Sequence, residues 1–187
     1  MDPLRTLVER LDTNDPATAA HGRAVALWCS RIAASLRLSR DEQNWIVRSA
    51  QLHDVGKLCI PAELLRAPRV LTDEERVVVR DHVLFGERLL LDHGLAEYRG
   101  AVRSHHERYD GRGYPDGLRG DAIPLPARIV AVADAYDAMT GQRPYRFPMT
   151  PDRALLEIER MRGTQFEPEM VDVMLAVVGD SLRPVAV

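Results

Sequence analysis

Apolar residues recur at helical spacing along most of the chain. The stretch that begins at Asp15-Pro16 has a favourable N-cap followed by a proline in the first turn, which is typical of a helix start. We expect this helix to run to about Leu36. Its inward face carries residues spaced by four, three, four and four positions: His21, Val25, Trp28, Ile32 and Leu36. His21 therefore points in the same direction as the apolar residues.

Similar patterns predict helices through the rest of the sequence. Capping boxes begin two of them, at Ser39 and at Thr72. The expected helices cover residues 2–12, 39–56, 61–65, 72–93, 96–106, 126–140, 150–161 and a last segment after 168. Gly56 is expected to end the helix that contains it, in the left-handed conformation that glycine tolerates. No segment alternates convincingly as a β-strand, so we predict an all-α bundle of about seven to eight helices.

One long segment, Glu107 to Pro124, interrupts this helical pattern. Its turn signals follow one another closely: Asp110-Gly111, Pro115-Asp116-Gly117 and Arg119-Gly120-Asp121. A connection of this length without secondary structure is typically functional or disordered. Its aromatic and apolar residues favour function.

Composition narrows the class of protein. The 187 residues include 45% hydrophobic and 28% charged residues, with a net charge of −3, which fits a single domain (1–187) and gives no support for binding a nucleic-acid polymer. No apolar stretch is long enough to span a membrane, and Met1-Asp2-Pro3 does not resemble a signal peptide. We therefore expect a cytoplasmic protein in which Cys29 and Cys59 are reduced and semi-buried.

Five of the six histidines fall on inward faces or beside an acid. Each has an ordinary explanation alone, such as a buried imidazole bonded to a carbonyl; His93, the sixth, fits a helix C-terminus. Jointly these explanations fail, because an ordinary core does not need five imidazoles and two carboxylates. The candidate metal ligands are His21, His53, Asp54, His82, His105, His106 and Asp134. Asp137, one turn after Asp134, is a candidate hydrogen-bond partner for a ligating histidine.

Seven nitrogen and oxygen ligands exceed one tetrahedral zinc site and suit two octahedral cations that share Asp54 as a bridge. The mixture favours Fe, Mn or Zn over Mg or Ca. Two such cations, about 3.5–4 Å apart, can hold a hydroxide and stabilise both oxygens of a phosphoryl displacement. The chemistry indicated is metal-assisted phosphodiester hydrolysis, with Asp54 and Lys57 as catalytic residues. Lys57, Arg143 and Arg146 would neutralise substrate phosphate, although the two arginines also fit a solvated basic loop.

The ligand order, a histidine, then His-Asp, then a distant aspartate, resembles the HD phosphohydrolase superfamily. Within it the chain closely resembles the HD-GYP subfamily, which is named after the triplet found here as Gly113-Tyr114-Pro115. The resemblance spans about residues 14–178. Its motifs lie in residues 105–115, 123–129, 132–134, 137–140 and 143–146.

This resemblance implies an HD-domain helical bundle that opens cyclic di-GMP to linear pGpG, in some members onward to GMP. The matched histidines and aspartates would bind two divalent metal ions, iron or manganese, and Lys57, Arg143 and Arg146 would contact the substrate phosphates. The loop with Gly111, Gly113, Tyr114 and Pro115 would border the site and contribute to partner binding, including binding of diguanylate cyclase domains.

Two positions depart from the family pattern. Members with a third metal carry a glutamate four residues before the first histidine, where this chain has Ala17, so we predict two metals and incomplete conversion of pGpG to GMP. Val83 replaces a frequent proline, which we expect to be neutral. Members often carry a receiver or sensory domain as well, so the chain is either a stand-alone enzyme or an excised domain, and its oligomeric state is open.

Two alternatives compete with a phosphodiesterase. One is a catalytically weak signalling module that binds cyclic di-GMP or a protein; the complete ligand set argues against it. The other is a different HD-superfamily enzyme, acting on nucleoside phosphates or oxidising a substrate. The Gly-Tyr-Pro loop and the Arg143/Arg146 pair argue against that.

Overall fold

The computed structural model describes residues 2–142 and 147–182, and the predicted all-α class is confirmed. In the described ranges, extended pairing is limited to two isolated bridges, Asp110–Arg119 and Arg162–Phe166. The elements are α1 (Pro3–Asn14), α2 (Pro16–Ser35), α3 (Arg40–Leu52), η1 (Val55–Cys59), α4 (Ala62–Leu65), α5 (Asp73–Arg80), α6 (His82–Asp92), η2 (Ala96–Tyr98), α7 (Arg99–Ser104), η3 (Gly120–Ala122), α8 (Leu125–Thr140), α9 (Pro151–Arg160) and α10 (Pro168–Leu182).

The caps expected from the sequence define where several helices begin. The side chain of Asp15 accepts the backbone N–H of Thr18, at the start of α2. Ser39 and Thr72 both form complete capping boxes, each with the glutamate three residues later. These bonds satisfy N–H groups that have no partner within the helix.

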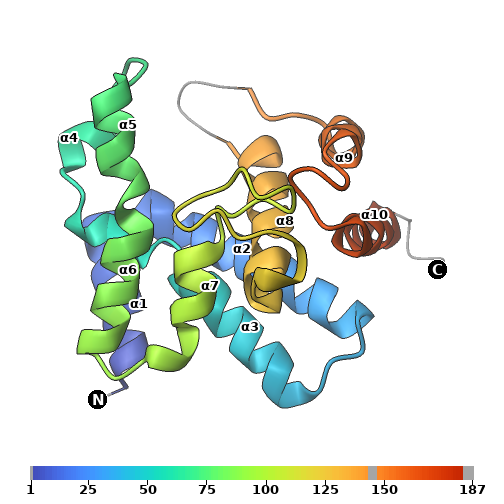
Figure 1. The fold of residues 1–187 in the computed structure, drawn as a ribbon, viewed down its shortest axis with the longest axis horizontal. Helices are drawn as coiled ribbons and strands as arrows, with labels where there is room; N and C mark the ends of the chain where they lie inside the picture. The colour runs from blue at the N-terminus through green and yellow to red at the C-terminus, as the bar shows by residue number, and fades with distance from the viewer. Residues whose placement is uncertain (1, 143–146, 183–187) are drawn as a thin grey trace.

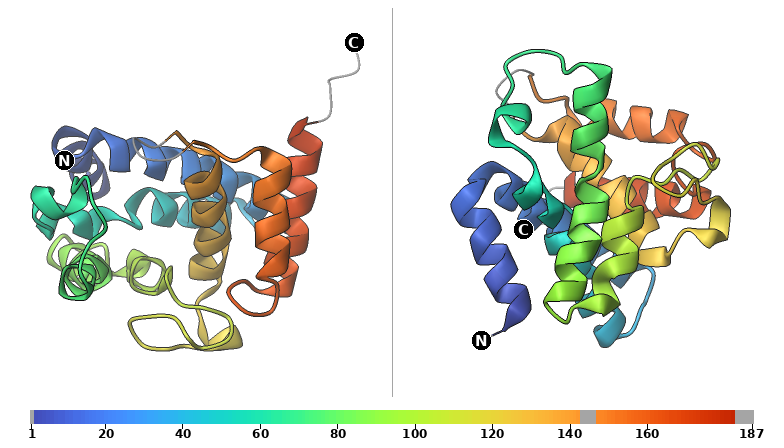
Figure 2. Two further views of the ribbon diagram at one scale, coloured as in Figure 1. Left: turned by 90° about the horizontal axis from the view of Figure 1, so that it is seen from above. Right: turned by 60° about the vertical axis from the view of Figure 1, so that its left-hand side comes forward.

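The helices enclose two apolar clusters that meet along the middle of the molecule. The larger cluster joins α2, α3 and α8 to α9 and α10, and the smaller joins α1 and α3 to α6 and α7. Figure 1 shows α8 between α6 and α7 on one side and α9 and α10 on the other, and Figure 2 shows the same order from above. Residues far apart in the sequence therefore meet where α2, α3, α6, α7 and α8 converge.

The prediction for Gly56 was wrong. The helix α3 ends at Leu52, and Gly56 lies inside η1 without a positive φ angle. Glycine is needed there for a different reason: a Cβ atom would lie 1.8 Å from the carbonyl oxygen of His82 and 2.5 Å from the backbone nitrogen of Gly86. Gly56 allows η1 to approach the start of α6 at backbone distance.

The expected helix 72–93 is divided at Asp81 into α5 and α6. His82 is buried, but Val78 and Phe85, which we expected beside it on an inward face, are each 39% exposed. Its burial therefore comes from the elements packed over it rather than from a continuous apolar face. As expected, His93 ends α6, and its Nδ1 donates to the carbonyl of Leu89.

Two further expectations need correction. The helix expected over 96–106 is made of η2 and α7 and ends at Ser104, so the histidine pair follows its last turn. The cysteines are not semi-buried: Cys29 is buried and Cys59 is exposed. No helix among residues 2–142 and 147–182 has the length and apolar character that crossing a membrane requires.

Candidate metal centre

The His53-Asp54 pair lies just past the end of α3, where the chain turns into η1. His53 donates through Nδ1 to the carbonyl of Ala50, at 2.7 Å. Asp54 is buried, and Lys57 donates to its Oδ2 at 2.6 Å. Burial alone would raise the pKa of Asp54, but the charges of Lys57 and His53 hold this pKa well below its usual range. The carboxylate is therefore ionised and available as a ligand.

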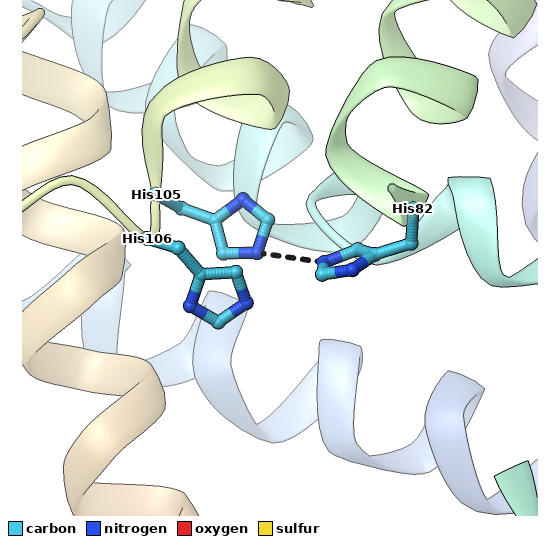
Figure 3. Close-up of side chains that lie close together, drawn as sticks. All are labelled: His82, His105 and His106. Atoms are coloured by element: carbon cyan, nitrogen blue, oxygen red, sulfur yellow. Dashed lines mark hydrogen bonds between the residues drawn. The ribbon is translucent and has the colours of Figure 1, made fainter. Parts of the chain in front are cut away.

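His82 and His105 approach the same region from the start of α6 and the end of α7 (Figure 3). Each donates through Nδ1 to a backbone carbonyl, His82 to Val79 at 2.8 Å and His105 to Val102 at 2.9 Å. Their Nε2 atoms lie 3.3 Å apart. In the neutral rings both Nε2 atoms are acceptors, so neither can satisfy the other. A cation bound between the two rings would satisfy both Nε2 atoms.

His106 completes this group, and Figure 3 shows its ring beside those of His82 and His105. Burial lowers the pKa of all three histidines, to about 4 for His106 and well below the usual value for His105. Neutral imidazoles are the form that binds metal ions.

His21, on α2, is held differently. Its Nε2 lies 2.8 Å from Oδ1 of Asp134, and its Nδ1 lies 2.6 Å from Oδ2 of Asp137. Burial acts to lower the pKa of His21, but hydrogen bonds to both aspartates outweigh it and raise this pKa to about 9. A carboxylate bonded to Nδ1 orients the ring and makes Nε2 a stronger ligand. Asp137 occupies this position, which is the role expected from its spacing.

Six of the seven candidate ligands form two groups, and the seventh, Asp134, is bonded to His21 of the first group. One group contains His21, His53 and Asp54, and the other contains His82, His105 and His106; within each, the ligand atoms lie within 4.8 Å of one another. Asp54 faces both groups, because its Oδ2 lies 3.3 Å from Nε2 of His53 and its Oδ1 lies 3.3 Å from Nε2 of His82.

This donor set fits two divalent metal ions. It supplies five imidazoles, ionised carboxylates, and one carboxylate placed between the two groups. The Nδ1 atoms of four imidazoles are hydrogen-bonded, those of His21, His53, His82 and His105. When bound, the cations would supply an activated water and stabilise charge on phosphate oxygens. Ala17, one helical turn before His21, is exposed and offers no further ligand.

The loop from Glu107 to Pro124 packs against the second group of histidines. Glu107, which sequence reasoning missed, is buried and accepts the backbone N–H groups of Asp116 at 2.7 Å and Leu118 at 3.1 Å. A Cβ atom on Gly113 would lie 2.4 Å from the backbone of Glu107, so this position requires glycine. The carboxylate thus fixes the loop from inside. Its only sequence signal was a carboxylate placed at the start of a turn-rich segment.

Tyr114 is the residue through which this loop contacts the candidate metal centre. Its ring stacks on His106, with centroids 4.9 Å apart and planes inclined by 22°. The guanidinium of Arg80, at the end of α5, lies 5.1 Å from the centroid of the same ring. Sequence reasoning also missed Arg80. The predicted phosphate contacts Arg143 and Arg146 lie outside the described residues.

Comparison with known proteins defines the class. The HD domain family model matches residues 5–170, and the chain belongs to this family. The predicted membership of the HD superfamily is confirmed.

Particular relatives narrow the comparison. The cyclic di-GMP phosphodiesterase response regulator RpfG of Xanthomonas campestris is 41% identical over 177 residues, which cover 93% of this chain and 47% of that protein. The 3′3′-cGAMP-specific phosphodiesterase 2 of Vibrio cholerae is 35% identical, over 90% of this chain and 33% of that protein. The chain thus spans about half, or less, of the length of these relatives.

A solved structure supports the fold. The HDG"Y"P protein Bd1817 from Bdellovibrio bacteriovorus superposes with a TM-score of 0.71, over 88% of this chain and 53% of that chain, at 19% identity.

Proposed function

We propose that this chain is a metal-dependent phosphodiesterase that hydrolyses cyclic di-GMP to linear pGpG. The observation that carries the proposal is the position of Asp54 between the two groups of histidines, with one oxygen at 3.3 Å from each. A bridging carboxylate of this kind is what a pair of divalent cations requires for displacement at a phosphodiester. The names of the similar phosphodiesterases support cyclic dinucleotides as the substrate class.

The residues of the chain have distinct tasks in this proposal. Asp54 would hold the two cations, iron or manganese, and Lys57 donates to one oxygen of Asp54 while the lysine side chain remains 24% exposed. The ammonium group would attract the scissile phosphate as a point charge. Arg143 and Arg146 stay predicted phosphate contacts.

The proposal extends to properties that follow from the family resemblance. We infer one HD-GYP domain over residues 1–187, a cytoplasmic location, and a loop at Gly111, Gly113, Tyr114 and Pro115 that contacts substrate or partner proteins such as diguanylate cyclase domains. Self-association is compatible with the same surface. Ala17 in place of a ligating residue supports two cations rather than three, and therefore pGpG as the main product.

The test is anaerobic purification followed by elemental analysis and product analysis with cyclic di-GMP. We expect about two iron or manganese ions per chain and accumulation of pGpG. The variant Ala17→Glu should bind a third cation and release more GMP. A metal-loaded protein that leaves cyclic di-GMP and 3′3′-cGAMP intact would contradict the proposal.

A further inference from the structure

Arg80 lies at the edge of the candidate metal centre, and no carboxylate among the described residues pairs with it. It is exposed, and it is the last residue of α5. Its one recorded interaction within residues 2–142 and 147–182 is the stack over the ring of Tyr114, which leaves the five N–H donors of the guanidinium without an acceptor in that part of the chain. Other exposed arginines do have carboxylate partners, as Arg69 has with Glu75 and Arg23 has with Asp12.

Tyr114 fixes where this cation sits. Because Tyr114 stacks on Arg80 and also on His106, the guanidinium is one aromatic ring away from a candidate metal ligand. Burial raises the pKa of the Tyr114 hydroxyl, and the charges of Asp54 and Asp134 act in the same direction while Arg80 opposes them. The ionisation of Tyr114 therefore depends on both the carboxylates of the centre and the guanidinium.

Arg80 differs from Lys57 in what it can still bind. Lys57 donates to Asp54 at 2.6 Å and lies at the centre. Arg80 lies further out and has its planar set of donors uncommitted. A guanidinium of this kind pairs with phosphate through two parallel hydrogen bonds.

We propose that Arg80 binds the phosphate of a cyclic dinucleotide that is not being cleaved. The inference rests on the proposed function. The phosphate under attack would lie between the histidine groups, at Asp54 and Lys57. Arg80 is linked to the centre through the ring of Tyr114, which stacks on His106. A cyclic dinucleotide has a second phosphodiester, and Arg80 offers the charge and geometry to hold it. The residue would thus favour dinucleotides over substrates with one phosphodiester.

The experiment compares Arg80→Ala, Arg80→Lys and Arg80→Gln with Arg88→Ala, which removes an exposed arginine of α6 that is paired with Asp92. The substrates are cyclic di-GMP and bis(p-nitrophenyl) phosphate, which has one phosphodiester and no nucleobase. We expect Arg80→Ala to lower kcat/KM for cyclic di-GMP about tenfold, chiefly through KM, and to leave the small diester unchanged. Lysine should recover part of the loss and glutamine should not.

Three results would overturn the inference. Equal loss on both substrates would assign Arg80 to the integrity of the centre, recovery by glutamine as well as lysine would indicate a nucleobase contact, and unchanged kcat/KM would remove Arg80 from the site. Melting temperatures verify that each variant is folded. Equilibrium binding of cyclic di-GMP to the metal-loaded variants separates the two proposals: a wild-type protein that binds but does not cleave contradicts the phosphodiesterase activity, while tenfold weaker binding by Arg80→Ala still supports the role of Arg80.

Discussion

The histidines of the candidate centre are held by two opposite kinds of chemistry. His82 and His105 donate to backbone carbonyls, which are neutral acceptors, and burial lowers their pKa values. His21 lies between two carboxylates, Asp134 and Asp137, and its pKa is raised to about 9. One residue type therefore has two charge states at neutral pH within a single cluster.

This difference indicates how the chain prepares each group of ligands, or half of the centre, for a metal ion. The group around His82 is neutral before a cation binds. The free-energy cost of this group is that of burying imidazoles whose Nε2 atoms face one another. The group around His21 stores a proton that the cation must displace, but its carboxylates make it the stronger donor once the proton has left. Asp54 is the residue that both halves share, and the largest effects should follow its removal.

The substitution Asp54→Asn should have the largest effect. Asparagine keeps the shape but removes the charge from both groups of ligands, so we expect loss of both cations and a fall in turnover of about a thousandfold. Elemental analysis and hydrolysis of cyclic di-GMP measure the two effects. The control is Asp12→Asn, an exposed aspartate paired with Arg23, which should change neither. Full retention of one cation would show that the halves do not share Asp54.

The substitution Gly56→Ala should disturb the close contact between η1 and α6, which connects the two halves of the centre. A Cβ atom there would lie 1.8 Å from the carbonyl oxygen of His82, so η1 and α6 must separate. We expect the free energy of unfolding to fall by about 3 kcal/mol, with weaker metal binding at the His82 group. Denaturant unfolding of the metal-free protein measures this.

Gly179→Ala is the matched control for that variant, because a Cβ atom at this position in α10 would meet nothing within 4 Å. It should be neutral or stabilising by up to about 1 kcal/mol. Equal free energies of unfolding for the two alanine variants would mean that η1 and α6 can separate without loss of stability.

The pH dependence of metal binding should distinguish the halves directly. Because the pKa of His21 is about 9, one proton competes with the cation at neutral pH, and affinity at this group should rise about tenfold per pH unit from pH 7 to 9. Since the pKa of His106 is about 4, affinity at the His82 group should be nearly constant over that range. Manganese titrations of the metal-free protein from pH 6.5 to about 9.5 test this. Two sites with the same pH dependence would contradict the distinction.

The sequence predicted the metal ligands better than it predicted the contacts that position them. Helical spacing is a local property, and it was enough to turn His21 inward and to place Asp137 one turn from Asp134. The requirement for Gly56 arises from the approach of α6, which is distant in sequence, so the same glycine was interpreted wrongly as a helix end.

Long-range contacts explain the other omissions as well. Arg80 has no periodic or motif signal, and its position over Tyr114 exists only because the loop folds back across the end of α5. Glu107 is recognisable only when the N–H groups of Asp116 and Leu118 converge on it. The break at Asp81 interrupts a segment whose composition continues as helix on both sides.

The substitution Asp137→Asn should have the smallest effect, and it affects one half alone. The amide oxygen of asparagine can still accept the Nδ1–H of His21, so the ring keeps its orientation, but the charge that makes Nε2 a strong donor is lost. The same change lowers the pKa of His21, and easier release of the proton offsets part of the loss at neutral pH. We expect affinity at the His21 group to fall about tenfold at pH 9 and less at pH 7, with the His82 group unchanged. An equal loss at both groups, measured by the same manganese titrations, would mean that Asp137 supports the whole cluster and that the two halves are not independent.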